Sequence, residues 1–100
     1  RGVPPVVNDP VATEFLSQVA GAELGADAIL FSDQSWGGDT FAWFLESVPG
    51  SYARLGVHDP ASSELLDLHA STFDIDERAI GIGVRTLAAT ALSWLRAQQA

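Results

Sequence analysis

The chain contains no cysteine, so its two histidines are the side chains best suited to catalysis or metal binding. His69 follows Asp67 at a spacing of two, and alternate residues of an extended segment point to the same side. A carboxylate that accepts a hydrogen bond from one imidazole nitrogen leaves the other nitrogen free to bind a metal ion. His69 is therefore a candidate metal ligand with Asp67 behind it, although the local sequence alone favours a structural or merely exposed histidine.

The other groups of this kind have simpler interpretations. His58 precedes Asp59-Pro60, a turn sequence, and is predicted to be a surface turn residue without a functional role. Asp33 and Asp39 could form a carboxylate pair for acid–base catalysis, but a loop acid and a helix cap are the preferred interpretation. No catalytic residue is therefore assigned within this chain.

A loop at residues 36–40 is the candidate ligand-binding segment. It lies where a predicted strand ends and a predicted helix begins, a position at which α/β proteins bind ligands. Gly37 and Gly38 would let backbone amides approach a bound group, and a helix N-terminus after Asp39 would favour an anion. A tight turn without a ligand is an equally good interpretation of the local sequence. The loop lacks the spacing and the lysine of a phosphate-binding loop.

These residues must be positioned by elements that alternate between extended segments and helices. Asp9 and Pro10 predict a helix start, and Gly25 predicts its end. The acid-x-x-Glu spacing at 74–77 predicts a capping box for the last helix. An apolar stripe along that helix consists of Ile80, Val84, Leu87, Ala91 and Leu95. The predicted order is β-α-β-α-β-α, an α/β pattern, over residues 2–8, 10–24, 28–31, 41–48, 52–57 and 74–96.

The composition is that of a folded, acidic chain. Of 100 residues 47% are hydrophobic, and thirteen Asp and Glu oppose five arginines, for a formal net charge of −8. Such a surface repels nucleic-acid phosphates and anionic membranes, so neither is an expected partner. No apolar run approaches the roughly 20 residues needed to span a bilayer. The lack of cysteine makes the cytoplasm the default location, and the lack of methionine predicts a piece of a longer polypeptide.

Four blocks of the sequence, in order and at matching spacing, resemble the C-terminal end of M20 metal-dependent amidohydrolases. The branch is that of aminoacylases, hippurate hydrolases and auxin-conjugate hydrolases. The blocks are Pro4-Pro5-Val6-Val7-Asn8-Asp9, Gly37-Gly38-Asp39-Thr40-Phe41-Ala42, Pro49-Gly50 with Leu55-Gly56, and Leu68-His69 with Phe73-Asp74-Ile75-Asp76-Glu77. Each block alone is weak, but the ordered set covers nearly the whole chain.

The resemblance implies an organisation and a reaction. Residues 1–8 would be the last strand of a lid domain, and residues 9–100 the C-terminal portion of a zinc-peptidase-like α/β catalytic domain. The parent enzyme would hold two divalent ions, Zn or Mn, and hydrolyse N-acyl amino acids or related amide conjugates. His69 would bind one metal ion, and Gly37, Gly38 and Asp39 would border the substrate. The remaining ligands and the general base would lie upstream in the same polypeptide, which could dimerise through the lid.

The sequence departs from the family pattern at one position pair, and one alternative to the hydrolase interpretation is left open. The family's Glu-Asp pair in the glycine loop reads Asp39-Thr40 here, which leaves the substrate preference open. The alternative is a non-catalytic protein: an acidic α/β interaction module or a degenerate relative retained for binding. The 100-residue segment alone is predicted to be inactive, because it carries one metal ligand instead of three or four.

Overall fold

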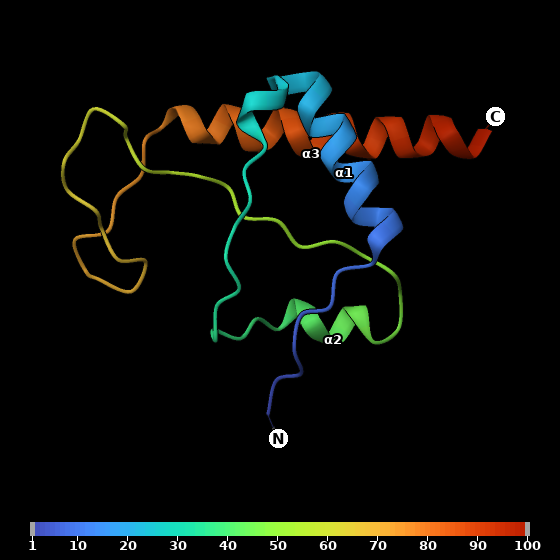
Figure 1. The fold of residues 1–100 in the computed structure, drawn as a ribbon, viewed down its shortest axis with the longest axis horizontal. Helices are drawn as coiled ribbons and strands as arrows, with labels where there is room; N and C mark the ends of the chain where they lie inside the picture. The colour runs from blue at the N-terminus through green and yellow to red at the C-terminus, as the bar shows by residue number, and fades with distance from the viewer. Residues whose placement is uncertain (1, 100) are drawn as a thin grey trace.

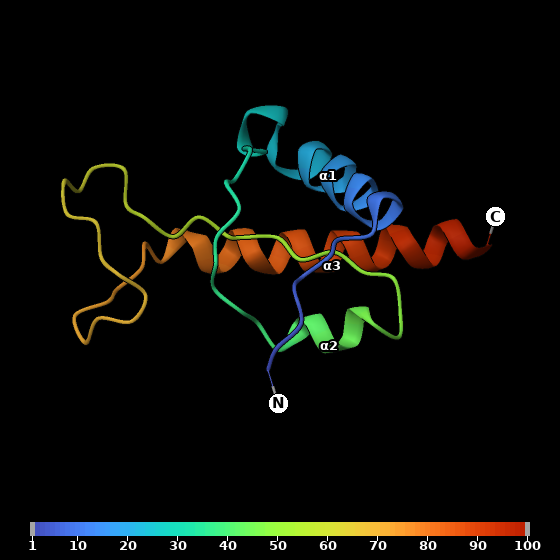
Figure 2. The same cartoon turned by 60° about the horizontal axis from the view of Figure 1, so that its bottom comes forward.

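The computed structural model describes residues 2–99, which form two long helices, one short helix and extended connections (Figure 1). The elements are α1 (Pro10–Leu24), the 3-10 helix η1 (Ala26–Ala28), α2 (Phe41–Leu45) and α3 (Arg78–Gln99). Helix α1 crosses α3 and packs on it, whereas α2 stands apart from this pair near the N-terminus (Figure 2). None of the described helices combines the length and apolarity that bilayer crossing requires.

The start and end of α1 confirm the sequence prediction. Asp9 is the N-cap, and its Oδ2 accepts a hydrogen bond from the amide of Ala12 at 2.8 Å, while Pro10 occupies the first turn, where no amide donor is needed. At the other end, Gly25 has a φ of 97°, a left-handed conformation that glycine adopts without a side-chain clash. Its amide donates to the carbonyl of Gly21 at 2.9 Å, which ends the helix.

The start of α3 differs from the predicted capping box. The amide of Asp76 donates to the carbonyl of Val57 at 2.8 Å, which keeps Asp76 outside the helix. Asp76 then accepts from the amide of Arg78 at 3.0 Å, whereas the carboxylate of Asp74 accepts only from the next residue, Ile75, at 2.8 Å. The prediction that Asp74 caps this helix is wrong, because a tertiary hydrogen bond moves the helix start to Arg78.

No strand is assigned between residues 2 and 99, and the segments predicted as strands run as unpaired or irregular chain. A strand needs a neighbouring strand to satisfy its amides and carbonyls. At Tyr52 a side chain forms the two hydrogen bonds that a neighbouring strand would form. The side chain of Asn8 accepts from the amide of Tyr52 at 2.7 Å and donates to its carbonyl at 3.2 Å. The α/β class remains a prediction about the larger domain.

The described part of the chain buries very little. Its buried side chains are three alanines, Ala20, Ala42 and Ala79. The packing of α1 on α3 rests on an edge-to-face contact between Phe15 and Trp94, with ring centroids 5.1 Å apart, and on an ion pair between Glu23 and Arg85 at 3.1 Å. The two helices therefore meet without a large apolar core.

The apolar stripe of α3 faces outward. Ile80 is 58% exposed, Leu87 is 72% exposed and Leu95 is 60% exposed, although the sequence predicts them on a buried face. Residues 29–31, predicted as a buried strand, are also exposed, and Phe31 is 94% accessible. Large contiguous apolar surfaces are rare on soluble monomers. The described residues thus leave most of their large apolar side chains in contact with solvent.

Candidate functional site

Asp39 connects the glycine loop to α2. Its Oδ1 accepts a hydrogen bond from the amide of Phe41 at 2.8 Å, while Thr40 makes no side-chain capping bond. Thr40 occupies the N-cap position, but the side-chain hydrogen bond to the start of α2 comes from Asp39, one residue before it, as its interpretation as a helix cap expects. Gly37 and Gly38 lie exposed just before it.

The second oxygen of Asp39 binds a residue that the sequence analysis missed. The hydroxyl of Tyr52 donates to Oδ2 of Asp39 at 3.0 Å, and the ring of Tyr52 packs near Phe41, with centroids 5.8 Å apart. This hydrogen bond, with the negative charge of Asp39, raises the pKa of the Tyr52 phenol, because both favour the protonated form. Tyr52 was predicted only as a strand residue.

The raised pKa of Tyr52 gives a testable pH dependence. It lies above the ordinary value of 10.0, so the bonded phenol stabilises the fold below that value, and the contribution is lost as the pH rises through the raised pKa. We expect Asp39→Asn to move the pKa of Tyr52 down toward its ordinary value. The ionisation can be followed by the ultraviolet absorbance of tyrosinate, with Tyr52→Phe as the blank.

The matched control for this titration is Asp33→Asn, which removes another carboxylate from the same loop without touching Tyr52. It should leave the pKa of Tyr52 in place. Equal shifts in both variants would mean that the general negative field, and not the hydrogen bond to Asp39, governs this phenol.

Arg54 is the second residue missed by the sequence analysis. Its Nη1 donates to Ser32 Oγ at 2.8 Å and to the carbonyl of Asp33 at 3.1 Å, and its Nη2 donates to Ser35 Oγ at 2.8 Å. Between residues 2 and 77 it is the only arginine in a chain without lysine. Local spacing gives no signal for this contact, because Arg54 lies 19 to 22 positions from its three partners.

His69 lies in an exposed turn within the connection between residues 58 and 74. Oδ1 of Asp67 accepts from the backbone amide of His69 at 2.8 Å, so the carboxylate closes a local turn and does not contact the imidazole through this bond. Within residues 2–99 no hydrogen bond to the imidazole is seen, and the residue as a whole is exposed. The roles of His69 as ligand and of Asp67 as its outer partner remain predictions.

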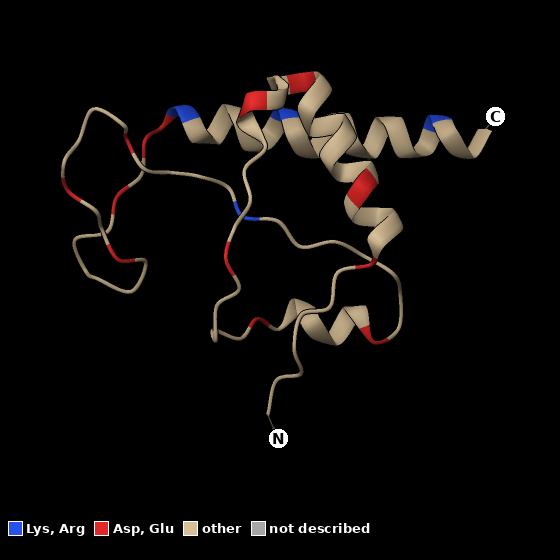
Figure 3. Cartoon of the chain, viewed as in Figure 1, with Lys and Arg blue, Asp and Glu red and all other residues tan. Residues whose placement is uncertain are grey.

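The structure does not bring the two candidate sites together. In both views the connection 58–74 extends from one end of α3, away from the loop at 32–40 (Figures 1 and 2). Among residues 2–99 no group of three or more His, Cys, Asp or Glu side chains could hold a metal ion. Most of the acidic residues lie in the loops and a few lie on α1 and η1, while three of the five arginines lie along α3 (Figure 3).

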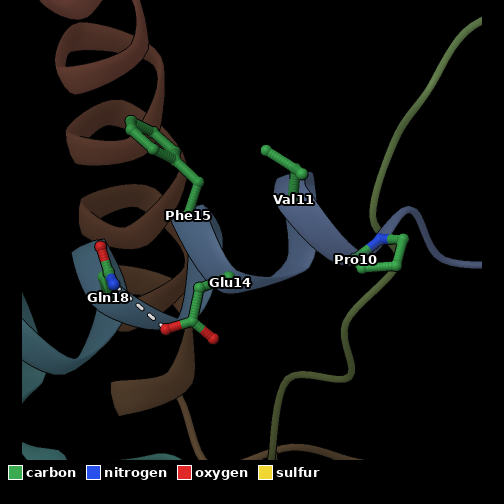
Figure 4. A pocket seen from close by; sticks show the side chains of 5 residues that line it. All are labelled: Pro10, Val11, Glu14, Phe15 and Gln18. Carbon is green, nitrogen blue, oxygen red and sulfur yellow. Dashed lines mark hydrogen bonds between the residues drawn. The ribbon is translucent and has the colours of Figure 1, made fainter.

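Two open hollows lie elsewhere on the surface. One of about 390 Å³ runs along α1 and is lined by Pro10, Val11, Glu14, Phe15 and Gln18, with Gln18 bonded to Glu14 at 3.0 Å (Figure 4). The other, of about 420 Å³, lies between residues 7–10 and 45–50. Neither is lined by His69 or by the residues of the glycine loop, so neither is the predicted substrate pocket.

Comparison with known proteins relates the chain to enzymes of amide chemistry. It is 36% identical over 85 residues to the N-acetyldiaminopimelate deacetylase of Pediococcus pentosaceus, a match that covers 83% of this chain and 20% of the relative. It is 26% identical over 92 residues to IAA-amino acid hydrolase ILR1-like 4 of Arabidopsis thaliana, covering 92% of this chain and 21% of that protein.

A third relative carries a different name. The chain is 51% identical over 89 residues to a Rhodococcus jostii (strain RHA1) protein named "Putative glutamate--cysteine ligase 2-3", a match that covers 89% of this chain but only 11% of that protein. Most of the named ligase therefore lies outside the matched segment.

No protein-family profile and no solved structure matches this chain. The chain spans between about a tenth and a quarter of the length of the curated relatives it matches. Several of those relatives are named as hydrolases that act on amide conjugates. The chain is thus a relative of one segment of amide-hydrolysing enzymes.

Proposed function

We propose that residues 9–100 form the C-terminal part of the catalytic domain of an M20-type metal-dependent amidohydrolase, with residues 1–8 as the last strand of its lid. The reaction is hydrolysis of the amide bond in an N-acyl amino acid or a related conjugate. The observation that carries this proposal is the set of relatives named for such hydrolysis, which match this chain over nearly all of its length.

The exposed apolar faces support the proposal that the chain belongs to a larger domain. Nineteen large hydrophobic side chains are exposed among the described residues, and four of those on α3, Ile80, Val84, Leu87 and Leu95, follow one helical stripe. A parallel sheet and further helices of the same catalytic domain would cover such faces. The predicted strands 28–31 and 52–57 would then find their pairing partners in that sheet.

Each candidate residue has a specific part in this proposal. His69 offers an exposed imidazole to one of two divalent ions, whose ligand set is completed by upstream residues. The ions supply Lewis-acid activation of the attacking water when bound. Gly37 and Gly38 present backbone amides to the substrate, since nothing covers them in the described chain, and Asp39 fixes the end of that loop against α2.

Metal removal tests the proposed function. The polypeptide that contains this segment should release free amino acid from N-acetyl or longer N-acyl amino acids. Dialysis against a chelator should lower that rate by at least about a hundredfold, because the cations stabilise the developing charge by several kcal/mol, and Zn or Mn should restore it. Undiminished hydrolysis by protein shown to be metal-free by elemental analysis would exclude this mechanism.

The Rhodococcus relative supplies a second candidate, an amide-forming function, because its identity of 51% is high and its name describes ligation. The hydrolase is preferred because the chain occupies only 11% of that relative, against about a fifth of the hydrolases. Incubation of the same protein with glutamate, cysteine and ATP separates the two. Formation of a glutamyl-cysteine amide without hydrolysis of N-acyl amino acids would favour the ligase.

A further inference from the structure

The loop at residues 32–39 is held by two alternate residues of one extended segment. Tyr52 and Arg54 are two positions apart, so their side chains can leave the backbone on the same side. Arg54 holds the first half of the loop through Ser32, the carbonyl of Asp33, and Ser35. Tyr52 holds its end through Asp39. The two glycines lie between these anchor points.

Apolar packing contributes little to the position of this loop. Trp36, beside the glycines, is fully exposed at 101%. A Cβ added at Gly37 would meet only Ser35 Oγ, at 3.7 Å, and one added at Gly38 would meet only Val3, at 3.7 Å. Because glycine has the largest conformational freedom of all residues, such a segment is ordered only at an entropic cost. The polar contacts from residues 52 and 54 are what offset that cost.

We propose that Arg54, assisted by Tyr52, is a positioning residue that holds the Gly37–Gly38 backbone in place to receive the substrate. This inference rests on the proposed function, in which that backbone borders the amide substrate. Arg54 does not touch the substrate in this proposal; it acts through Ser32 and Ser35.

Only an arginine at position 54 can form this set of three hydrogen bonds. The guanidinium is planar and presents several N–H donors in a fixed fork, so that two of its nitrogens reach two hydroxyls and a carbonyl at once. A lysine has a single nitrogen on a flexible stem and cannot span Ser32 and Ser35 in the same way. Charge-assisted hydrogen bonds of this kind are stronger than those between neutral groups.

The kinetic test uses Arg54→Met in the polypeptide that contains this segment. A loosened loop must be ordered during binding, so we expect KM for an N-acyl amino acid to rise about tenfold while kcat changes less than about threefold. Arg54→Lys should recover only a small part of the loss. The control is Arg85→Met, which removes an arginine paired with Glu23 between α1 and α3 and should leave KM unchanged.

A second measurement decides the proposal independently of activity. With 5-fluorotryptophan incorporated, the ¹⁹F resonance of Trp36, assigned through Trp36→Phe, should shift or broaden in Arg54→Met, whereas that of Trp94 should not. If no N-acyl amino acid is hydrolysed, the proposed function fails while this spectrum still reports on the loop. An unchanged Trp36 resonance in Arg54→Met would overturn the positioning role.

The acceptors provide a variant that leaves the arginine in place. Ser32→Ala with Ser35→Ala should reproduce the KM and ¹⁹F changes of Arg54→Met, and combining all three substitutions should add little, because they remove the same interactions. Fully additive effects, or equal effects of Arg54→Met and Arg85→Met, would show that Arg54 acts through general stability and would contradict the proposal.

Discussion

Replacing His69 by alanine in the parent enzyme should reduce the rate of amide hydrolysis by more than about a hundredfold. Loss of a residue that only supports a metal ligand lowers affinity or activity by up to about a hundredfold, and loss of the ligand itself should cost more. The physical reason is that the proposed function makes His69 a ligand of one of two metal ions, and a cation that loses a ligand binds more weakly and orients water less well. Elemental analysis should show occupancy falling from two metal ions toward one per chain.

His58→Ala is the matched control for this substitution. Both histidines are exposed in the same connection between residues 58 and 74, so both variants lose an exposed imidazole ring from this connection. Only the loss of His69 should affect metal content and rate. Normal activity in His69→Ala, or an equal loss in His58→Ala, would remove the ligand assignment.

Residues 1–100 prepared alone should unfold without a single cooperative transition and should bind an apolar dye such as ANS. The reason is that the buried side chains of the described residues are only three alanines, while the stripe of α3 and residues 29–31 are exposed. Without a packed core there is little to make unfolding cooperative, and exposed apolar surface is the property that ANS detects. Circular dichroism during thermal unfolding and ANS fluorescence measure the two effects.

A variant in which the apolar stripe of α3 is made polar tests whether that stripe causes the ANS binding. Replacing Ile80, Val84, Leu87 and Leu95 by glutamine should lower ANS binding and self-association, while the helix signal is largely kept because glutamine is a good helix former. The alternative interpretation, an independent acidic interaction module, predicts the opposite for the natural chain. A sharp, probe-independent unfolding transition of residues 1–100 would favour that module over a segment of a hydrolase.

The sequence predicts helix ends correctly where one residue forms a hydrogen bond, or adopts a backbone conformation, within one turn of the helix end. Asp9, Pro10 and Gly25 set the two ends of α1 because an N-cap carboxylate, a ring without an amide hydrogen and a left-handed glycine act within one turn. Asp39 accepts from the first amide of α2 by a similarly short-range contact. The predicted box at 74–77 failed because it competes with a bond from Asp76 to the distant carbonyl of Val57.

The candidate site was only partly accessible to sequence reasoning. The glycine loop could be located because two adjacent glycines after an apolar run form a local pattern. Its anchors, Tyr52 and Arg54, could not, because their hydrogen bonds join residues 13 to 22 positions apart and no local rule selects such pairs. Asp67 was expected to approach an imidazole, but its short side chain reaches the nearby amide of His69 first.

The sequence by itself therefore determined the ends of α1, the extent of most of α3 and the position of the glycine loop before α2. Each of these depends on residue type and on neighbours within about one helical turn. Only the tertiary structure decided which side chains hold the glycine loop, where α3 begins and which apolar faces remain uncovered. These depend on contacts between segments far apart in the chain, whose partners are chosen by three-dimensional packing and cannot be read from local spacing.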